Sequence, residues 1–229
     1  MQYFKQIAAA LVLSLIVCAS ASATTATGEF AFNFATQGNE NPFVDASFTD
    51  RLASDAQISG GLLTQVGFAH YLVAYTGGTY DGGSITASVE VDATAVDDEV
   101  LVGALDENGD GFMLEISPTA VFVLVYTAYA VVDSVGTASI TFTADDLFEF
   151  TLTKGSPNTY SATQNGTPIT LSQSSEAKTL GTMEAVWGFN VGNAGLGTIQ
   201  SLAVVDGLSV GGGGGSAAAR AVHHKRLRN

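Results

Sequence analysis

Short stretches in which apolar and polar residues alternate run through most of the chain. In residues 87–92 the alanine and both valines fall on one face, and the serine, glutamate and aspartate fall on the other. Residues 148–152 alternate in the same way, with two phenylalanines and a leucine on one side. A period of two with β-branched and aromatic residues is typical of half-buried antiparallel strands. Residues 121–132 are apolar on both faces, which indicates a central strand or a strand pair.

Turn-forming residues separate these stretches at short intervals. Asn165-Gly166, between two alternating stretches, is the strongest hairpin signal. Beyond residue 23 no segment has a sustained 3.6-residue period, and no repeat of fixed spacing disturbs the pattern. We therefore predict an all-β fold, an antiparallel β-sandwich or jelly roll. The other predicted turns are Gly60-Gly61, Gly77-Gly78, Gly82-Gly83, Asn108 to Gly111 and Asp133 to Gly136.

The first 23 residues have the features of an export signal. Lys5 supplies a short positive region, residues 7–17 are apolar apart from one serine, and Ala21-Ser22-Ala23 fits a cleavage site. The apolar run is too short to anchor the chain across a bilayer, so no membrane span is expected. Cleavage would also remove Cys18, the only cysteine, and leave a mature protein without disulfides. We therefore expect a protein that is secreted or held at the cell surface.

The other end differs in composition. Residues 211–215 are all glycine, and such a run is expected to behave as a flexible linker. Residues 220–229 beyond it are rich in arginine, lysine and histidine. The predicted organisation is a signal peptide at 1–23, one sandwich domain at 24–210, and a glycine-rich linker with a basic, disordered tail at 211–229.

Charge is distributed unevenly between body and tail. Residues 29–206 carry all 22 acidic residues but only three basic ones, Arg51, Lys154 and Lys178, which gives a net charge of −19. An acidic body repels nucleic acid and anionic lipid, so neither is an expected partner. The basic tail either remains solvated or binds an anionic polymer or the acidic body of a second copy. Self-association is therefore possible.

Several segments together resemble the concanavalin-A-like lectin and glucanase superfamily, including its laminin-G-like domains, over residues 29–210. The early segment has Asn41-Pro42 before the first hairpin, and a strand pair at 100–105 and 111–116 suits the centre of a sheet. A strand at 142–152 leads into the hairpin of residues 159–171, followed by a glycine-rich stretch at 188–197 and a closing strand at 202–208. The resemblance implies the concanavalin-A-like jelly-roll fold and leaves function open.

Enzymes of the glycoside hydrolase type are one alternative that this resemblance raises. They carry Glu-x-Asp-x-x-Glu on one strand, with carboxylates acting as nucleophile and acid/base. Glu90 and Asp92 match the first two positions, but Ala95 stands at the third. No serine or cysteine nucleophile motif accompanies His70. We therefore expect no catalytic residues, and interpret Glu90 and Asp92 as the solvated face of a strand.

A calcium site is a second possibility, although we predict no metal site and no cofactor. Asp106, Asn108 and Asp110 are spaced as at the start of a calcium-binding loop, with Gly111 permitting a sharp turn. The twelfth position is Ser117 instead of the bidentate glutamate. Asparagine, aspartate and glycine also simply form turns between strands.

Sugar binding is the function we favour from the sequence. Aromatic rings that stack on sugars, with polar groups at the hydroxyls, are the chemistry required. Tyr71, Tyr75, Tyr80 and Trp187 are the candidate carbohydrate-binding residues, with core packing as the alternative for Trp187. The predicted function is a non-catalytic module that binds carbohydrate or an extracellular matrix polymer. The alternatives are a structural surface or matrix protein that self-associates through its body and tail, and a glycoside hydrolase-like enzyme.

Overall fold

The computed structural model describes residues 30–34, 48–52, 56–59, 62–65, 70–80, 83–91, 100–141, 145–190 and 198–206. Within these residues all sixteen elements are β-strands, which confirms the predicted all-β class. None of them forms a helix long and apolar enough to cross a membrane. The predicted signal peptide, linker and tail lie outside the described residues, as do residues 24–29 and 207–210 of the predicted domain.

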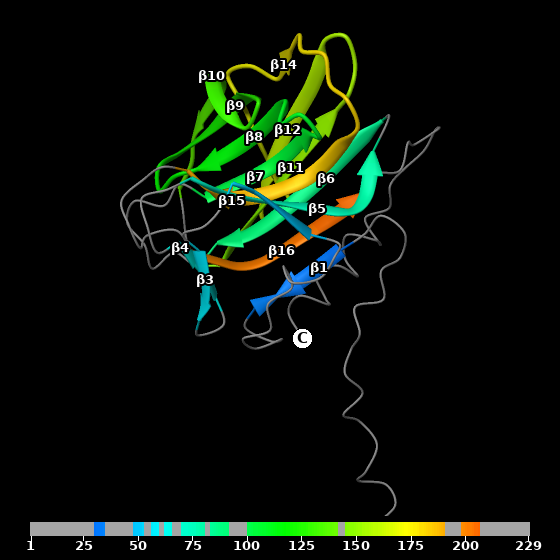
Figure 1. Ribbon diagram of the computed structural model, residues 1–229. Helices are drawn as coiled ribbons and strands as arrows, with labels where there is room; N and C mark the ends of the chain where they lie inside the picture. Colours follow the sequence, from blue (N-terminus) through cyan, green and yellow to red (C-terminus); the bar gives the residue numbers. More distant parts are fainter. Residues whose placement is uncertain are drawn as a thin grey trace, which may run out of the picture.

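Every pair of neighbouring strands is antiparallel, and the strands form two sheets that pack face to face (Figure 1). One sheet has nine strands, in the order β13-β12-β11-β6-β16-β4-β3, with β1 beside β16 and β14 beside β12. Its strands are β1 (Phe30–Asn33), β3 (Ala56–Ser59), β4 (Leu62–Gln65), β6 (Ser84–Val91), β11 (Asp146–Thr153), β12 (Asn158–Gln164), β13 (Thr167–Ile169), β14 (Ser175–Glu176) and β16 (Thr198–Asp206).

The other sheet has seven strands, in the order β10-β9-β8-β7-β15-β5-β2. These are β2 (Phe48–Leu52), β5 (Tyr71–Tyr80), β7 (Val100–Asp106), β8 (Gly111–Ile116), β9 (Ala120–Thr127), β10 (Ala130–Ser139) and β15 (Met183–Phe189). The strand pair β7–β8 lies near the middle of this sheet, as expected for residues 100–116. The apolar residues 121–132 form a strand pair, β9 and the start of β10.

The main core lies between the two sheets, and the alternation of each strand decides which residues enter it. From β6, Val89 and Val91 point inward, and from β11 Phe148 and Phe150 do the same. Trp187 on β15 is fully buried among them and donates its indole N–H to the backbone oxygen of Ser88 at 2.9 Å. Side chains from both sheets therefore fill a single inter-sheet layer, as in other sandwiches.

The predicted turns differ in outcome. Asn165 and Gly166 both have positive φ, 52° and 78°, and join β12 to β13 as the type I′ hairpin that this pair favours. Gly77 and Gly78 lie inside β5, so the turn predicted there is wrong. The pairing of β5 with β15 is irregular over this stretch, which is a common role for glycine within a strand.

The turn predicted at residues 133–136 is also wrong. This segment lies within β10, where register shifts between Val131 and Asp133 and between Ser134 and Gly136 absorb the extra residues. The chain reverses instead at Ala128 and Tyr129, which have φ of 51° and 62°. Neither residue favours a positive φ, so the sequence carries no turn signal there.

Candidate functional site

The outer face of the seven-stranded sheet carries a second apolar cluster, separate from the inter-sheet core. We call it the outer cluster, and each of its side chains is at most 5% exposed. Partly buried Leu52, Phe122 and Tyr129 pack against it. An outer sheet face of this kind is usually half solvated, so its burial requires a cover. The outer cluster consists of Leu72, Ala74, Leu101, Leu105, Met113, Leu124, Tyr126 and Val186.

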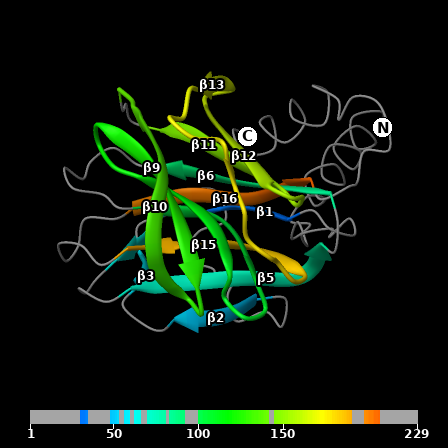
Figure 2. The same cartoon turned by 90° about the horizontal axis from the view of Figure 1, so that it is seen from above.

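The two edges of the seven-stranded sheet approach each other over this face. Arg51 lies on β2 at one edge, and Tyr129 lies in the turn between β9 and β10 near the other. The Arg51 guanidinium nevertheless stands 5.9 Å from the centroid of the Tyr129 ring, within cation–π range. Arg51 also forms an ion pair with Glu184 of β15. Figure 2 shows the β9–β10 hairpin reaching towards β2, so the coiling of the sheet encloses the outer cluster.

Three polar side chains lie around Tyr126 of the outer cluster. Tyr126 of β9 shares a hydrogen bond of 3.0 Å with Nε2 of His70, which immediately precedes β5. Glu115 of β8 accepts a hydrogen bond through Oε2 from the side-chain amide of Asn190, which immediately follows β15. His70, Glu115 and Asn190 are all partly exposed, whereas Tyr126 is buried. These four residues bring together a carboxylate, an amide, an imidazole and a phenol.

Phe122 adds an aromatic ring to this group. It is the cross-strand partner of Glu115 in the β8–β9 pairing, and both side chains point to the outer face. Directly opposed residues of antiparallel strands have Cβ atoms about 5 Å apart, so the two side chains are neighbours on this face. Phe122 is only partly buried. We call Phe122, Glu115, Asn190 and His70 the outer-face site.

Burial shifts the ionisation of both titratable residues in the outer-face site. It raises the pKa of the Glu115 carboxyl above its ordinary value, and the hydrogen bond from Asn190 opposes this rise. Burial lowers the pKa of His70, so the neutral imidazole is favoured. It also raises the pKa of the Tyr126 phenol, helped by the nearby Glu115 charge. The site therefore holds a carboxylate in apolar surroundings beside a neutral histidine.

Glu115→Gln is expected to make the folded protein less sensitive to pH. A carboxyl whose pKa is raised by folding stabilises the fold below its unfolded pKa, and that contribution is lost as pH rises through the folded pKa. Glutamine keeps the shape of the side chain without its charge. The variant should therefore gain stability relative to the wild type as the pH rises from the unfolded to the folded pKa of Glu115. Urea unfolding of both proteins from mildly acidic to neutral pH measures the difference. Parallel pH profiles for the two proteins would contradict the burial of this charge.

The aromatic residues predicted from the sequence lie elsewhere. Tyr71, Tyr75 and Trp187 are buried in the inter-sheet core, with exposures of 6%, 1% and 0%. Stacking on a sugar needs an exposed ring face, and these three rings present none in this structure. Tyr80 ends β5, but its side chain is outside the described residues. The structure therefore does not bring the four predicted residues together on one surface.

The acidic pair considered for catalysis also differs from expectation. Glu90 was expected on a solvated strand face, and this is wrong: it is only 9% exposed and accepts a hydrogen bond from the Ser201 hydroxyl at 2.9 Å. It lies on β6 of the nine-stranded sheet, away from the outer-face site. Asp92 is outside the described residues. Glu90 is thus held within the fold by a neighbouring strand.

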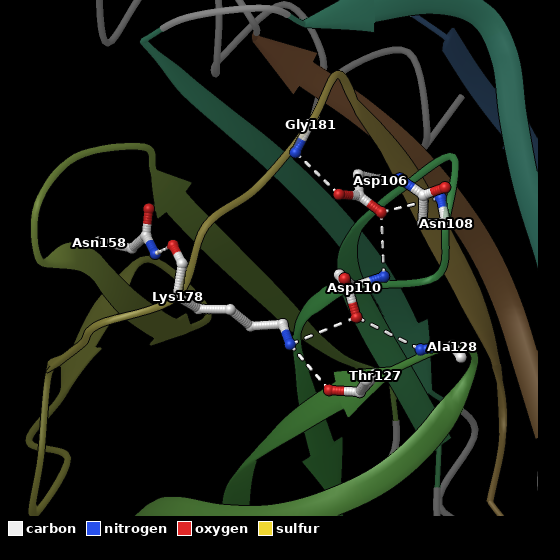
Figure 3. A network of polar contacts seen from close by, with 8 residues as sticks. All are labelled: Asp106, Asn108, Asp110, Thr127, Ala128, Asn158, Lys178 and Gly181. Carbon is white, nitrogen blue, oxygen red and sulfur yellow. Dashed lines mark hydrogen bonds and ion pairs between the residues drawn. The ribbon is translucent and has the colours of Figure 1, made fainter.

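The loop considered for calcium forms the tight turn between β7 and β8 (Figure 3). Oδ1 of Asp106 accepts backbone N–H groups from Asn108 and Asp110, and Oδ2 accepts that of Gly181 at 2.7 Å. Oδ1 of Asp110 lies 3.3 Å from Nζ of Lys178 and accepts a bond from the backbone of Ala128. In the part of the chain that the structure describes, no acidic or histidine cluster is suited to a metal. These carboxylates join three segments of the fold instead.

Calcium is expected to leave the melting temperature within about 1 °C of its value in chelator, because a ligand stabilises only the state that binds it. The Asp106 and Asp110 oxygens already accept bonds from protein donors. Thermal unfolding in calcium chloride and in chelator provides the comparison. A rise of several degrees in calcium that Asp110→Asn removes would show that the loop binds the ion.

A shallow groove of about 590 Å³ lies apart from the outer-face site. It runs between the end of β10 and the β12–β13 hairpin, and its lining mixes hydroxyl and amide side chains, such as Ser139 and Gln164, with apolar ones, such as Ile140 and Ile169. No aromatic ring lines it. It therefore offers no aromatic ring for a sugar to stack on.

No protein-family model and no curated protein matches the sequence. Solved structures do match the fold. The carbohydrate binding module CBM66 from Bacillus subtilis aligns over 68% of this chain and 94% of its own, with a TM-score of 0.50 and 4% identity. The Emp47p carbohydrate recognition domain aligns over 82% and 99%, with a TM-score of 0.51 and 9% identity. The VIP36 exoplasmic/lumenal domain, in a Ca²⁺/Man-bound form, aligns over 84% and 93%, with a TM-score of 0.52 and 6% identity.

Proposed function

We propose that this chain, which has the concanavalin-A-like lectin/glucanase sandwich fold, is a secreted or cell-surface, non-catalytic module that binds carbohydrate. Carbohydrate-binding modules and lectins share its fold. Because one fold hosts many functions, this likeness supports the proposal only together with the chemistry of a site. An extracellular matrix polymer that carries sugars fits the same proposal.

The grouping of Phe122 with Glu115 and Asn190 is the observation that carries the proposal. A sugar presents an apolar ring face and a rim of hydroxyls, and binding sites match these with an aromatic ring and a few fixed polar groups. Phe122 is partly exposed and lies across the strand pair from Glu115, a carboxylate that accepts hydrogen bonds, and Asn190 adds an amide that both donates and accepts them. Bonding between Asn190 and Glu115 holds both groups in place, which reduces the entropy lost on binding.

The pairing of Glu184, a second carboxylate on this face, supports a non-catalytic role. Glycoside hydrolases use two carboxyl groups, one of which acts as nucleophile or base. Glu184 on β15 is instead ion-paired with Arg51 of β2.

A glycan array tests the proposal, with the whole chain applied in calcium and in chelator. We expect binding to at least one class of glycan, unchanged by the chelator. Phe122→Ala should weaken that binding by about tenfold or more, because stacking on an aromatic side chain contributes roughly 1–3 kcal/mol for a nucleobase, and each 1.4 kcal/mol is tenfold in affinity. Val132→Ala is the matched control, since Val132 is 59% exposed and lies on β10 at the sheet edge.

Absence of binding to any glycan in either condition would contradict the proposal. Equal loss of binding in Phe122→Ala and Val132→Ala would contradict the assignment of the site. Circular dichroism of both variants separates lost binding from lost folding, because a folded Phe122→Ala protein keeps the spectrum of the wild type.

A further inference from the structure

Only one oxygen of the Glu115 carboxylate has a hydrogen-bond partner among the described residues. Oε2 accepts from Asn190, and no described donor bonds to Oε1. The carboxylate is nevertheless partly buried, in a setting that raises the pKa of this group. A carboxylate removed from water without a full set of partners is costly to keep charged. It is therefore an acceptor with capacity left for a ligand.

None of the basic side chains of the acidic body is directed at this carboxylate. Arg51 pairs with Glu184, Lys178 with Asp110, and the Lys154 ammonium donates to the backbone oxygen of Gly181 at 2.9 Å. His70 is the one ionisable nitrogen in the outer-face site, and burial favours its neutral form by lowering its pKa. In the part of the chain that the structure describes, Glu115 has no cationic partner.

The rings beside Glu115 favour a positive charge as well. The face of an aromatic ring attracts cations, and Phe122 lies directly across the strand pair from the carboxylate. The buried Tyr126 is close enough for the Glu115 charge to affect its pKa. The body as a whole carries a net charge of −19, which concentrates cations at its surface and repels anions.

We propose that the outer-face site binds glycans that carry a free, protonated amino group, such as glucosamine oligomers, in preference to neutral or anionic glycans. The ammonium supplies hydrogen-bond donors and is the cationic partner that Glu115 otherwise lacks among the described residues, while Phe122 stacks on the sugar ring. A uronic acid or sulfated sugar would place a second negative charge beside a partly buried carboxylate. This selectivity rests on the proposed function, because it names the sugar class for the same site.

Matched oligosaccharides test the selectivity directly. Glucosamine oligomers and N-acetylglucosamine oligomers of equal length differ in the charge of each amino group, and they are titrated by calorimetry at a pH at which the free amines are protonated. The wild type is expected to bind the free-amine form at least about tenfold more tightly, and added salt should reduce this preference. Glu115→Gln, which keeps the shape of the side chain, is expected to abolish the preference.

Glu107→Gln is the matched control. Glu107 is exposed in the β7–β8 turn, and the substitution makes the same change in net charge. Loss of the preference in Glu115→Gln but not in Glu107→Gln supports a direct contact between Glu115 and the ammonium. Equal losses in both variants would show that the preference comes from the net negative charge of the protein, and would overturn the inference. Tighter binding of N-acetylated or anionic oligomers would overturn it while leaving carbohydrate binding intact. Absence of binding to all oligomers, together with a blank glycan array, would overturn the proposed function itself.

Discussion

Replacing Trp187 with alanine is expected to lower the free energy of unfolding by about 4 kcal/mol. The side chain is fully buried in the inter-sheet core, and removing a buried tryptophan costs the transfer of its apolar surface plus the cavity left behind. The substitution also leaves the backbone oxygen of Ser88 without its indole donor. Urea unfolding followed by far-ultraviolet circular dichroism measures the change, because the variant lacks the only tryptophan.

Val132→Ala again provides the control, since it removes a side chain that is 59% exposed and should change stability by about 0.5 kcal/mol or less. In the wild type, Trp187 fluorescence should be blue-shifted and resist quenching by acrylamide. A Trp187→Ala protein as stable as the wild type, or a tryptophan that acrylamide quenches readily, would show that Trp187 is exposed. Trp187 would then again be a candidate sugar-binding residue.

Gly188→Ala is expected to destabilise the fold by about 4 kcal/mol or more, or to prevent folding. A Cβ at this position would stand 1.8 Å from the backbone oxygen of Tyr71 and 2.8 Å from its carbonyl carbon. Both atoms belong to the neighbouring strand β5, so no rotamer relieves the clash. The strands β5 and β15 would have to separate beneath the outer-face site. Yield of folded protein and urea unfolding report the effect.

Gly166→Ala is the matched substitution at a glycine without close neighbours. No atom lies within 4 Å of the new Cβ, and only the positive φ of 78° opposes alanine, at a cost of about 1 kcal/mol. Equal stability of Gly188→Ala and Gly166→Ala would contradict the close approach of β15 and β5. It would also weaken the account of how the coiled sheet encloses the outer cluster.

The alternation of apolar and polar residues was sufficient to predict the strands and the sandwich. In β6, β8 and β11 the alternating apolar residues do enter the inter-sheet core, as their period of two requires. Periodicity does not say which strands become neighbours. The nine- and seven-stranded orders depend on pairings between distant segments, such as β16 with β6 and β15 with β5.

Turn chemistry was informative only where glycine or asparagine occupies a positive-φ position. Asn165-Gly166 is such a case, and its hairpin was predicted correctly. At Ala128 and Tyr129 tertiary contacts overcome an unfavourable backbone preference. The backbone N–H of Tyr129 donates to the oxygen of Gly109 at 3.1 Å, and its hydroxyl donates to the oxygen of Glu107 at 3.0 Å. Contacts of this kind are invisible in a local sequence window.

The outer-face site was missed because its residues come from distant parts of the chain. Glu115 is a lone acidic residue in an apolar stretch, and Asn190 lies 75 positions away in the sequence. The alternation of residues 112–116 does contain one usable signal, since it puts Glu115 on the face opposite to Phe112 and Leu114. Choosing aromatic residues by their clustering selected Tyr71 and Tyr75, which are buried, because tyrosine also serves the core.

The most direct test of the account is to map where a bound glycan contacts the protein. The isotopically labelled chain is titrated with the tightest-binding glycan from the array, and amide chemical shifts are followed by NMR. We predict shift changes concentrated at Glu115, Phe122 and Asn190 and at the residues beside them. Changes confined to the groove between β10 and the β12–β13 hairpin, with the outer-face site unaffected, would contradict it.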